Sequence, residues 1–221
     1  MNSELLFRKY SLNYFKDNMK VLEIGPVGYP SYYSKVVDKK SLDWHTLDIG
    51  IEYIEKAEAN RNHIKSESEY NYPIPDNTYD IVLSGQVMEH VKDIWQWMTE
   101  LKRITKIGGH IIIVCPVSWP YHEAPVDCWR IYPEGMKALM EKVKLEIKKC
   151  VFESLELDLL PRNVPTFPGV STIPLNGKLF KTLKLKIIYN QIILRIPFIR
   201  RFSSPISVAY DTICISEKIQ G

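Results

Sequence analysis

The sequence predicts an α/β protein with a doubly wound, mainly parallel sheet of seven strands, an antiparallel last strand and a helical insertion. Short apolar runs, typical of strands buried on both faces, alternate with segments whose apolar residues recur every three or four positions. The first run, at residues 20–24, breaks directly into a turn that contains Gly25 and Gly28. Open α/β sheets bind their ligands at such a turn, so we expect a site there.

The composition limits the class of protein. The 221 residues are enough for one domain with a sizeable core, and 45% hydrophobic with 25% charged residues is typical of a soluble globular protein. The 29 basic and 26 acidic residues are too balanced to suggest a nucleic-acid partner. The four cysteines include no C-x-x-C pair, which predicts free thiols in a reducing compartment. The sequence also shows no cleavable apolar segment and no apolar run long enough to span a membrane, so we expect a cytoplasmic protein.

The first part of the chain is predicted to open with a helix and then to alternate strands with turns. Apolar residues at helical spacing mix with charges before the first strand, which predicts an N-terminal cap helix within residues 1–18. Residues 72–80 are rich in turn formers and lead into an apolar run, so we expect a strand directly after them. The other elements predicted here are strands at 20–24, 44–49, 62–65 and 81–84 and a short helix at 30–38.

The second part of the chain is predicted to complete a single domain, 1–221. Helical spacing of apolar residues predicts a helix at 92–106, and the pair Gly108–Gly109 is expected to stop it. The last two strands, 151–160 and 206–216, have no clear crossover helix between them, which allows an antiparallel arrangement. The remaining elements predicted here are a strand at 110–116, a helix at 134–148 and an insertion at 161–205.

Two acidic residues mark the ends of the first two strands. Asp48 follows Glu23 by 25 residues, near the spacing at which an acidic residue reaches a ribose diol in nucleotide-binding α/β folds. The dinucleotide fingerprint G-x-G-x-x-G is absent because Val27 stands two positions after Gly25, which disfavours a nicotinamide-dependent reductase. Alternatively, both acids are strand-end charges that cap a helix or face water.

Four motifs then occur in order along the chain. They are K-V-L-E-I-G-P-V-G at 20–28, Y-P-I-P-D-N-T-Y-D-I-V-L-S at 72–84, V-M-E-H-V at 87–91 and K-I-G-G at 106–109. Together they resemble the type-11 group of class I S-adenosylmethionine (SAM)-dependent methyltransferases, whose fold is Rossmann-like. Gly28 comes one residue earlier than the second glycine of that family's first motif. The resemblance implies methyl transfer with SAM as the cofactor.

The same resemblance implies where SAM would bind. The glycine turn would lie against the methionine part of SAM, Glu23 would hold its amino group, and Asp48 would accept hydrogen bonds from both ribose hydroxyls. Residues 84–86 would border the sulfonium and the acceptor. Relatives often use an Asp-Ala pair for the adenine, but this chain has S-E-S-E there. The implied cofactor-binding residues are Glu23, Gly25, Pro26, Gly28, Asp48, Ile49, Glu67, Ser68, Ser84, Gly85 and Gln86.

The acceptor is expected to bind at a loop rich in proline and aromatic residues, 116–133. Its pattern H-E-x-P-x-D-x-W-R resembles a subgroup associated with glycan and nucleotide-sugar biosynthesis, which implies a sugar acceptor. A hydroxyl group needs a general base, for which His122, Asp127 and His90 are the candidates. Alternatively, Asp127 pairs with Arg130 across one helical turn and fixes the loop. The pattern shows no clear set of metal ligands, so we predict no metal.

The leading prediction is an O-methyltransferase that moves a methyl group to a hydroxyl of a sugar or glycan precursor, by direct displacement with general-base help. Two alternatives stay open. The acceptor can be a small non-sugar molecule, such as an amine, a lipid or a quinone-like compound. The protein can also be one that binds SAM without catalysing a reaction.

The insertion differs in charge from the rest of the chain. Residues 160–210 contain eight Lys or Arg and no Asp or Glu, and their apolar residues predict a helix with one broad apolar side that Pro197 ends. Such a helix can simply pack over the sheet or the acceptor cleft with its lysines in solvent. Alternatively, residues 178–201 form a cationic surface for a phosphate-bearing acceptor or for peripheral contact with an anionic membrane.

Overall fold

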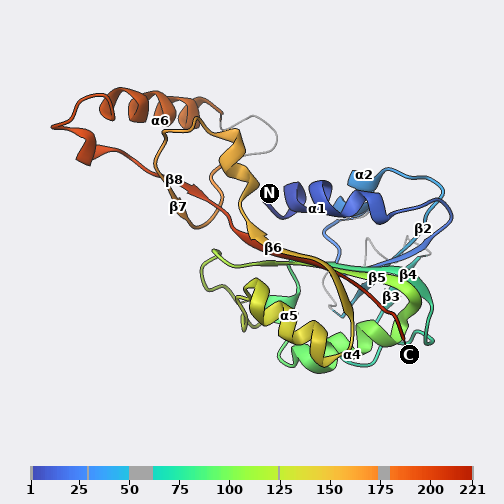
Figure 1. The fold of residues 1–221 in the computed structure, drawn as a ribbon. Coiled ribbons are helices and arrows are strands. Elements are labelled where there is room, and N and C mark those ends of the chain that lie inside the picture. The colour runs from blue at the N-terminus through green and yellow to red at the C-terminus, as the bar shows by residue number, and fades with distance from the viewer. Residues whose placement is uncertain (1, 29, 50–61, 124, 174–179, 221) are drawn as a thin grey trace.

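The computed structural model describes residues 2–28, 30–49, 62–123, 125–173 and 180–220. The strands of its main sheet are β1 (Lys20–Ile24), β2 (Asp43–Asp48), β3 (His63–Lys65), β4 (Tyr79–Gly85), β5 (Thr105–Pro116), β6 (Glu146–Glu153) and β9 (Asp211–Glu217). They are ordered β3-β2-β1-β4-β5-β9-β6 (Figure 1). The first five run parallel, whereas β9 is antiparallel to both of its neighbours. The predicted doubly wound sheet with an antiparallel last strand is confirmed.

Helices cover both faces of this sheet (Figure 1). The helices α1 (Asn2–Ser11) and α2 (Tyr32–Val37) lie on one face, and α4 (Ile94–Ile104) and α5 (Pro133–Lys142) lie on the other. Phe7 of α1 belongs to the same buried cluster as Ile81 of β4, whereas Trp97 of α4 belongs to a second cluster with Val82. Neighbouring strand residues therefore point into opposite cores, which explains the continuous apolar runs. The short 3-10 helices are η1 (Leu12–Tyr14), η2 (Met88–His90), η3 (Leu155–Leu159) and η4 (Arg200–Phe202).

The boundary between α5 and β6 lies earlier than the sequence predicts. The predicted helix at 134–148 ends at Lys142, and the predicted strand at 151–160 overlaps β6 only at 151–153, because β6 begins at Glu146 and η3 follows it. Lys144 has a left-handed φ of 58°. The amides of Lys144 and Leu145 donate to the carbonyls of Glu141 and Met140, each at 3.0 Å. This pattern ends helices, usually with glycine in the left-handed position.

The glycine pair Gly108–Gly109 lies inside β5 and does not stop the preceding helix. The helix α4 ends at Ile104, and β5 begins at the next residue. Gly108 has a φ of 77°, and a Cβ on Gly109 would lie 2.9 Å from the carbonyl oxygen of Asp80. The pair therefore permits an irregular stretch of β5 close against β4, where the register between the two strands shifts.

Part of the chain between β6 and β9 projects away from the sheet (Figure 1). We call the described residues 161–173 and 180–208 the arm. It contains β7 (Thr166–Pro168), α6 (Phe180–Ile193), η4 and β8 (Ile206–Val208), and β7 pairs with β8 in parallel. Its small core includes Val164, Ile173, Leu183, Ile206 and Val208. Among the described residues, no helix combines the length and the apolar character needed to cross a membrane.

Candidate active site

A cavity of about 680 Å³ opens at the carboxyl ends of β1, β2 and β4. The turn after β1, the end of β2 and the segment after β4 supply most of its wall. Its lining residues are Ile24, Gly25, Pro26, Val27, Gly28, Leu47, Asp48, Ile49, Glu69, Tyr72, Gln86, Val87, His90, Val91, Trp97 and Pro125. Of the predicted cofactor-binding residues, Gly25, Pro26, Gly28, Asp48, Ile49 and Gln86 line it, and His90 is the lining residue among the predicted catalytic candidates.

The turn after β1 depends on Gly25 for two reasons. Gly25 has a left-handed φ of 64°, and a Cβ there would collide with Cγ2 of Val87. Its amide donates to the carbonyl of Leu47 at 2.9 Å, which fixes the turn against β2. Gly28 is also left-handed, with a φ of 77°, but a Cβ there would come no closer than 4.0 Å to another residue's atom. Gly25 is therefore the position where a side chain would deform the cavity.

Glu23 lies beneath this turn and is not among the residues that line the cavity. Its carboxylate is buried and accepts hydrogen bonds from Ser31 Oγ and from Trp44 Nε1, the latter at 3.0 Å. Ser31 also caps α2, because its Oγ accepts from the amide of Ser34 at 3.1 Å. Burial raises the pKa of Glu23 to about 7, although both hydrogen bonds act to lower that pKa. Glu23 braces the turn, and its contact with a cofactor stays a prediction.

The raised pKa of Glu23 predicts a pH-dependent stability. Its ordinary pKa is 4.5 and its folded pKa about 7, so its stabilising effect is complete below pH 4.5 and is lost as the pH rises through 7. Glu23→Gln should still accept hydrogen bonds from Ser31 and Trp44. It should remove on the order of 2–3 kcal/mol of the fall in the free energy of unfolding with rising pH. Urea unfolding at pH 5 and pH 8 measures it, with Glu134→Gln as an exposed control. An unchanged pH dependence in Glu23→Gln would contradict the prediction.

Asp48 and Glu69 are the acidic residues of the cavity wall. Asp48 ends β2, and its Oδ1 accepts from the amide of Ile49 at 2.7 Å. Glu67 and Ser68, the predicted adenine contacts, do not line the cavity, whereas Glu69 does. The Oγ of Ser66 donates to the carbonyl of Ser68, and the Oγ of Ser68 accepts from the amide of Tyr70. Ser68 therefore builds the bend that presents Glu69, which the sequence did not single out.

Of the predicted residues 84–86, only Gln86 reaches the cavity wall. Ser84 is buried. A Cβ on Gly85 would collide with the ring of Tyr33, so this position needs glycine for that ring to pack there. Gln86 has a φ of 59°, and its Nε2 donates to Oδ1 of Asp211 at 3.1 Å. Burial raises the pKa of Asp211 to about 6. The first residue of β9 therefore holds the side chain of Gln86 in place.

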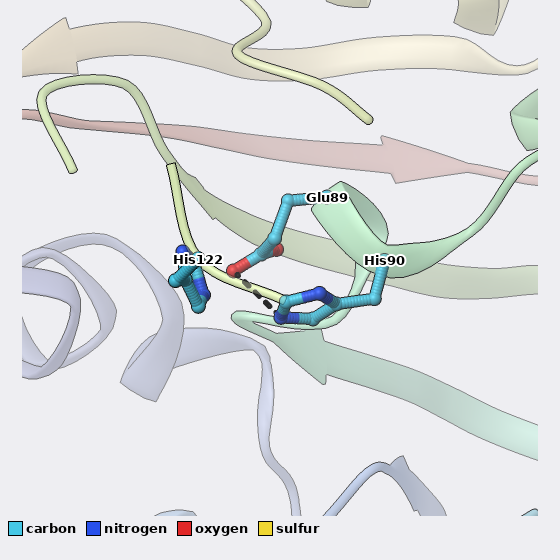
Figure 2. Close-up of side chains that lie close together, drawn as sticks. All are labelled: Glu89, His90 and His122. Carbon is cyan, nitrogen blue, oxygen red and sulfur yellow. Dashed lines mark ion pairs between the residues drawn. The ribbon is translucent and has the colours of Figure 1, made fainter. Parts of the chain in front are cut away.

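Glu89, His90 and His122 face one another (Figure 2), and His90 lines the cavity. One potential ligand atom from each lies within 4.8 Å of the others, and the rings of His90 and His122 meet edge to face with centroids 5.0 Å apart. His90 Nδ1 donates to the carbonyl of Val126 at 2.5 Å, since a carbonyl can only accept. In the neutral ring, Nε2 then keeps a lone pair, 3.8 Å from Oε1 of Glu89. Burial raises the pKa of Glu89 to about 7.

Asp127 is the ion-pair partner of Arg130, as the alternative interpretation expects, although the residues between them are not helical. Arg130 Nη1 and Nη2 donate to the two carboxylate oxygens at 2.5 and 2.6 Å. The backbone amide of His122 donates to Oδ2 at 2.8 Å, and His122 Nδ1 lies 3.2 Å from the same oxygen. The hydrogen bonds from Arg130 lower the pKa of Asp127 to about 2. Both oxygens are engaged, so Asp127 fixes the loop and orients His122, and it is a poor candidate for the base.

The cluster of Glu89, His90 and His122 could also hold a metal ion. Two imidazoles and one carboxylate are donors that suit transition-metal ions better than Mg²⁺. The sequence did not reveal this set because His122 lies in a loop far along the chain from the other two residues. The expectation that the protein uses no metal stays a prediction.

Comparison with known proteins relates the site to methyltransferases. Residues 22–113 match the model of a family described as a methyltransferase domain. An uncharacterized methyltransferase of Schizosaccharomyces pombe is 34% identical over 116 residues, which cover 46% of this chain and 41% of the relative. A demethylmenaquinone methyltransferase of Listeria monocytogenes is 27% identical over 96 residues, 43% of this chain and 38% of the relative. The chain spans less than half the length of these curated relatives.

Solved structures match over much more of the chain. A SAM-dependent methyltransferase from Archaeoglobus fulgidus superimposes with a TM-score of 0.60 at 17% identity, covering 97% of this chain and 92% of that one. This likeness shows the fold, which is the Rossmann-like fold of class I methyltransferases. The matched family segment contains the last three residues of β1, all of β2 to β4 and most of β5, the strands around which the cavity is built.

Proposed function

We propose that this protein is a SAM-dependent O-methyltransferase whose acceptor is a hydroxyl group of a sugar or glycan precursor. One observation carries the proposal. The three segments that supply most of the cavity wall, 24–28, 47–49 and 86–91, all lie within the stretch that matches a methyltransferase domain. They also meet at the carboxyl edge of a mainly parallel sheet, where such folds bind ligands.

SAM fits this cavity in size and in chemistry. The volume of about 680 Å³ lies within the range typical of sites for small molecules. The carboxylate of Asp48 accepts hydrogen bonds only, so it can take both hydroxyls of a ribose. Leu47, Ile49 and Trp97 supply apolar wall for a flat base, and Gly25 lets the ligand approach the backbone closely.

In this proposal the chain supplies a base and holds the acceptor in line. When bound, SAM would supply a methyl group on a positively charged sulfur, whose carbon–sulfur bond would break as the bond to the acceptor oxygen forms, with S-adenosylhomocysteine as the leaving group. His90 accepts the hydroxyl proton at Nε2, since His90 borders the cavity and its Nδ1 is committed to Val126. Glu89 beside it stabilises the imidazolium that results. Asp127 and Arg130 hold His122 in position, and with it the loop at 116–133, which we call the acceptor loop.

The acceptor loop supports a sugar as the acceptor. It exposes three aromatic side chains, Trp119, Tyr121 and Tyr132, whose flat faces suit the apolar faces of sugar rings. Its Ser118 bonds Tyr210 and Gly169, so the basic arm begins next to it and an acceptor that carries phosphate is favoured. The second candidate is a quinone-like acceptor, because relatives named demethylmenaquinone methyltransferases match part of the chain. Transfer of a labelled methyl group to nucleotide sugars or to a quinol, measured side by side, separates the two.

Asp48→Ala is expected to weaken SAM binding by about 1–3 kcal/mol, because two charge-assisted hydrogen bonds are lost. Titration calorimetry with SAM and with S-adenosylhomocysteine measures it. Asp43→Ala is the matched control, since Asp43 stands at the other end of β2 and bonds His45. Wild-type affinity in Asp48→Ala would refute the cofactor assignment. Binding in the wild type without transfer to any acceptor would favour a protein that binds SAM and catalyses nothing.

A further inference from the structure

The helix α6 carries two apolar stripes, and not the one broad apolar side that the sequence predicts. The first stripe contains Leu183 and Ile187, which pack on the core of the arm. The second faces solvent and is made of four residues at helical spacing whose exposed fractions are 67%, 51%, 42% and 55%, namely Leu185, Ile188, Tyr189 and Ile192. The first stripe already anchors α6 to the core of the arm. The exposed second stripe is therefore not needed for packing within the arm and needs another explanation.

The segment that follows α6 extends this apolar surface. Asn190 is buried and bonds both the carbonyl and the amide of Ser204, at 2.7 and 2.8 Å, and the hydroxyl of Tyr189 donates to the carbonyl of Phe202 at 2.8 Å. These bonds hold the returning chain against the helix. The returning chain exposes three further apolar side chains, Ile196, Phe198 and Phe202, with Phe198 89% exposed. Together with the exposed stripe they form what we call the tip surface.

The charge around the tip surface has one sign. Eight of the 29 basic residues of the protein and none of its 26 acidic residues lie within residues 160–210. Arg195, Arg200 and Arg201 are exposed next to the apolar side chains of the returning chain, and the guanidinium of Arg201 lies 5.0 Å from the ring centroid of Phe202. The rest of the chain has more acidic than basic residues, so the positive charge is concentrated on the arm.

We propose that the tip surface docks the protein on an anionic lipid bilayer. Exposed aliphatic and aromatic side chains among arginines are what an interfacial segment uses, since the apolar groups enter the acyl boundary and the cations meet lipid phosphates. The helix α6 has 14 residues, too few to span, so it lies in the plane of the membrane. A symmetric dimer through this surface is disfavoured, because it would bring the basic residues of two copies together with no acidic residue of the arm to neutralise them.

The arm is joined directly to the acceptor loop, so docking would bring that loop to the bilayer. The amide of Val117 donates to the carbonyl of Tyr210 at 2.9 Å, and the amide of Tyr210 donates to Ser118 Oγ at 2.8 Å. Ser118 Oγ in turn donates to the carbonyl of Gly169 in the arm at 3.0 Å. The proposal itself concerns the surface alone and does not depend on the reaction that the protein catalyses.

Sedimentation with vesicles tests the proposal in the absence of SAM and acceptor. The wild-type protein should pellet with vesicles of phosphatidylcholine and phosphatidylglycerol, pellet much less with phosphatidylcholine alone, and be released by high salt. Arg195→Gln/Arg200→Gln/Arg201→Gln should weaken partitioning on the order of a hundredfold. Ile188→Ser/Ile192→Ser should weaken it at least about tenfold.

Matched controls lie outside the arm. Lys40→Gln/Lys92→Gln/Lys142→Gln removes the same charge from exposed positions, and Ile107→Ser/Ile219→Ser removes exposed aliphatic side chains. Both controls should bind vesicles like the wild type, and thermal unfolding checks that every variant folds. The proposal is overturned if the wild type stays in the supernatant with anionic vesicles, or if the tip variants bind no more weakly than their controls. Ultracentrifugation showing a dimer that Ile188→Ser/Ile192→Ser dissociates, without vesicle binding, would assign the surface to self-association instead.

Discussion

His90→Gln is expected to lower kcat for methyl transfer by about 10²- to 10⁴-fold while SAM affinity changes little. Glutamine is similar in length and keeps a hydrogen-bonding end, but it cannot take up a proton near neutral pH. His90 is chosen because it lines the cavity, its Nδ1 is bonded to the carbonyl of Val126, and its Nε2 faces Glu89. Single-turnover transfer of a labelled methyl group measures the chemical step, and calorimetry with SAM measures binding.

Two variants make this result specific. His45→Gln is the control, because His45 bonds Asp43 and Tyr79 away from the cavity. His122→Gln should have a smaller effect than His90→Gln, since His122 is not among the cavity-lining residues and contacts Asp127 instead. A larger loss in His122→Gln would make His122 the base. Wild-type rates in both histidine variants would mean that positioning alone supplies the catalysis.

Gly25→Ala is expected to weaken SAM binding on the order of a hundredfold, because a Cβ would collide with Val87 and displace the turn that forms the cavity wall. The left-handed φ of 64° adds a backbone cost of about 1–2 kcal/mol. Gly25→Val should abolish binding, since two further methyl groups enter the same space. Calorimetry measures affinity, and thermal unfolding separates lost binding from lost folding.

A second variant pair isolates the collision from the backbone strain. Gly28→Ala places a Cβ at a left-handed φ of 77° without a close neighbour, so it should weaken binding much less than Gly25→Ala. Val87→Ala makes room for the new Cβ, so the double variant Gly25→Ala/Val87→Ala should bind more tightly than Gly25→Ala alone. If the double variant recovers no affinity, the effect of Gly25→Ala comes from backbone strain and not from the collision.

The positions of most strands along the chain and the mainly parallel sheet could be predicted, because the apolar runs of the strands are continuous where both faces of the sheet are covered. The predicted ends of helices and strands were wrong where a residue adopts an unusual backbone conformation. Lys144 is left-handed at the end of α5, and nothing in a lysine side chain signals that. The pair Gly108–Gly109 looks like a helix stop, yet it serves the close approach of β5 to Asp80.

The cavity was predictable where it depends on strand ends and not where it depends on loops. Gly25 directly follows β1 and Asp48 is the last residue of β2, so their place at one edge of the sheet follows from parallel topology. Glu69 reaches the cavity through a bend made by serine side chains, which leaves no periodic signal. Glu89 meets His122 only because the acceptor loop folds back, with the amide of Cys128 donating to the carbonyl of Glu89 at 2.7 Å.

The position of β9 has a consequence for how the chain folds. It lies between β5 and β6, and the arm separates it in sequence from both. Until β9 enters, β5 has an open hydrogen-bonding edge and β6 has no partner in the sheet, and both are ready templates for pairing with other chains. Closing so long a loop costs conformational entropy before any stabilising contact of β9 has formed, and this cost slows folding. This half of the sheet should therefore form last. Shortening the arm should therefore speed refolding and reduce aggregation while leaving the strand order unchanged.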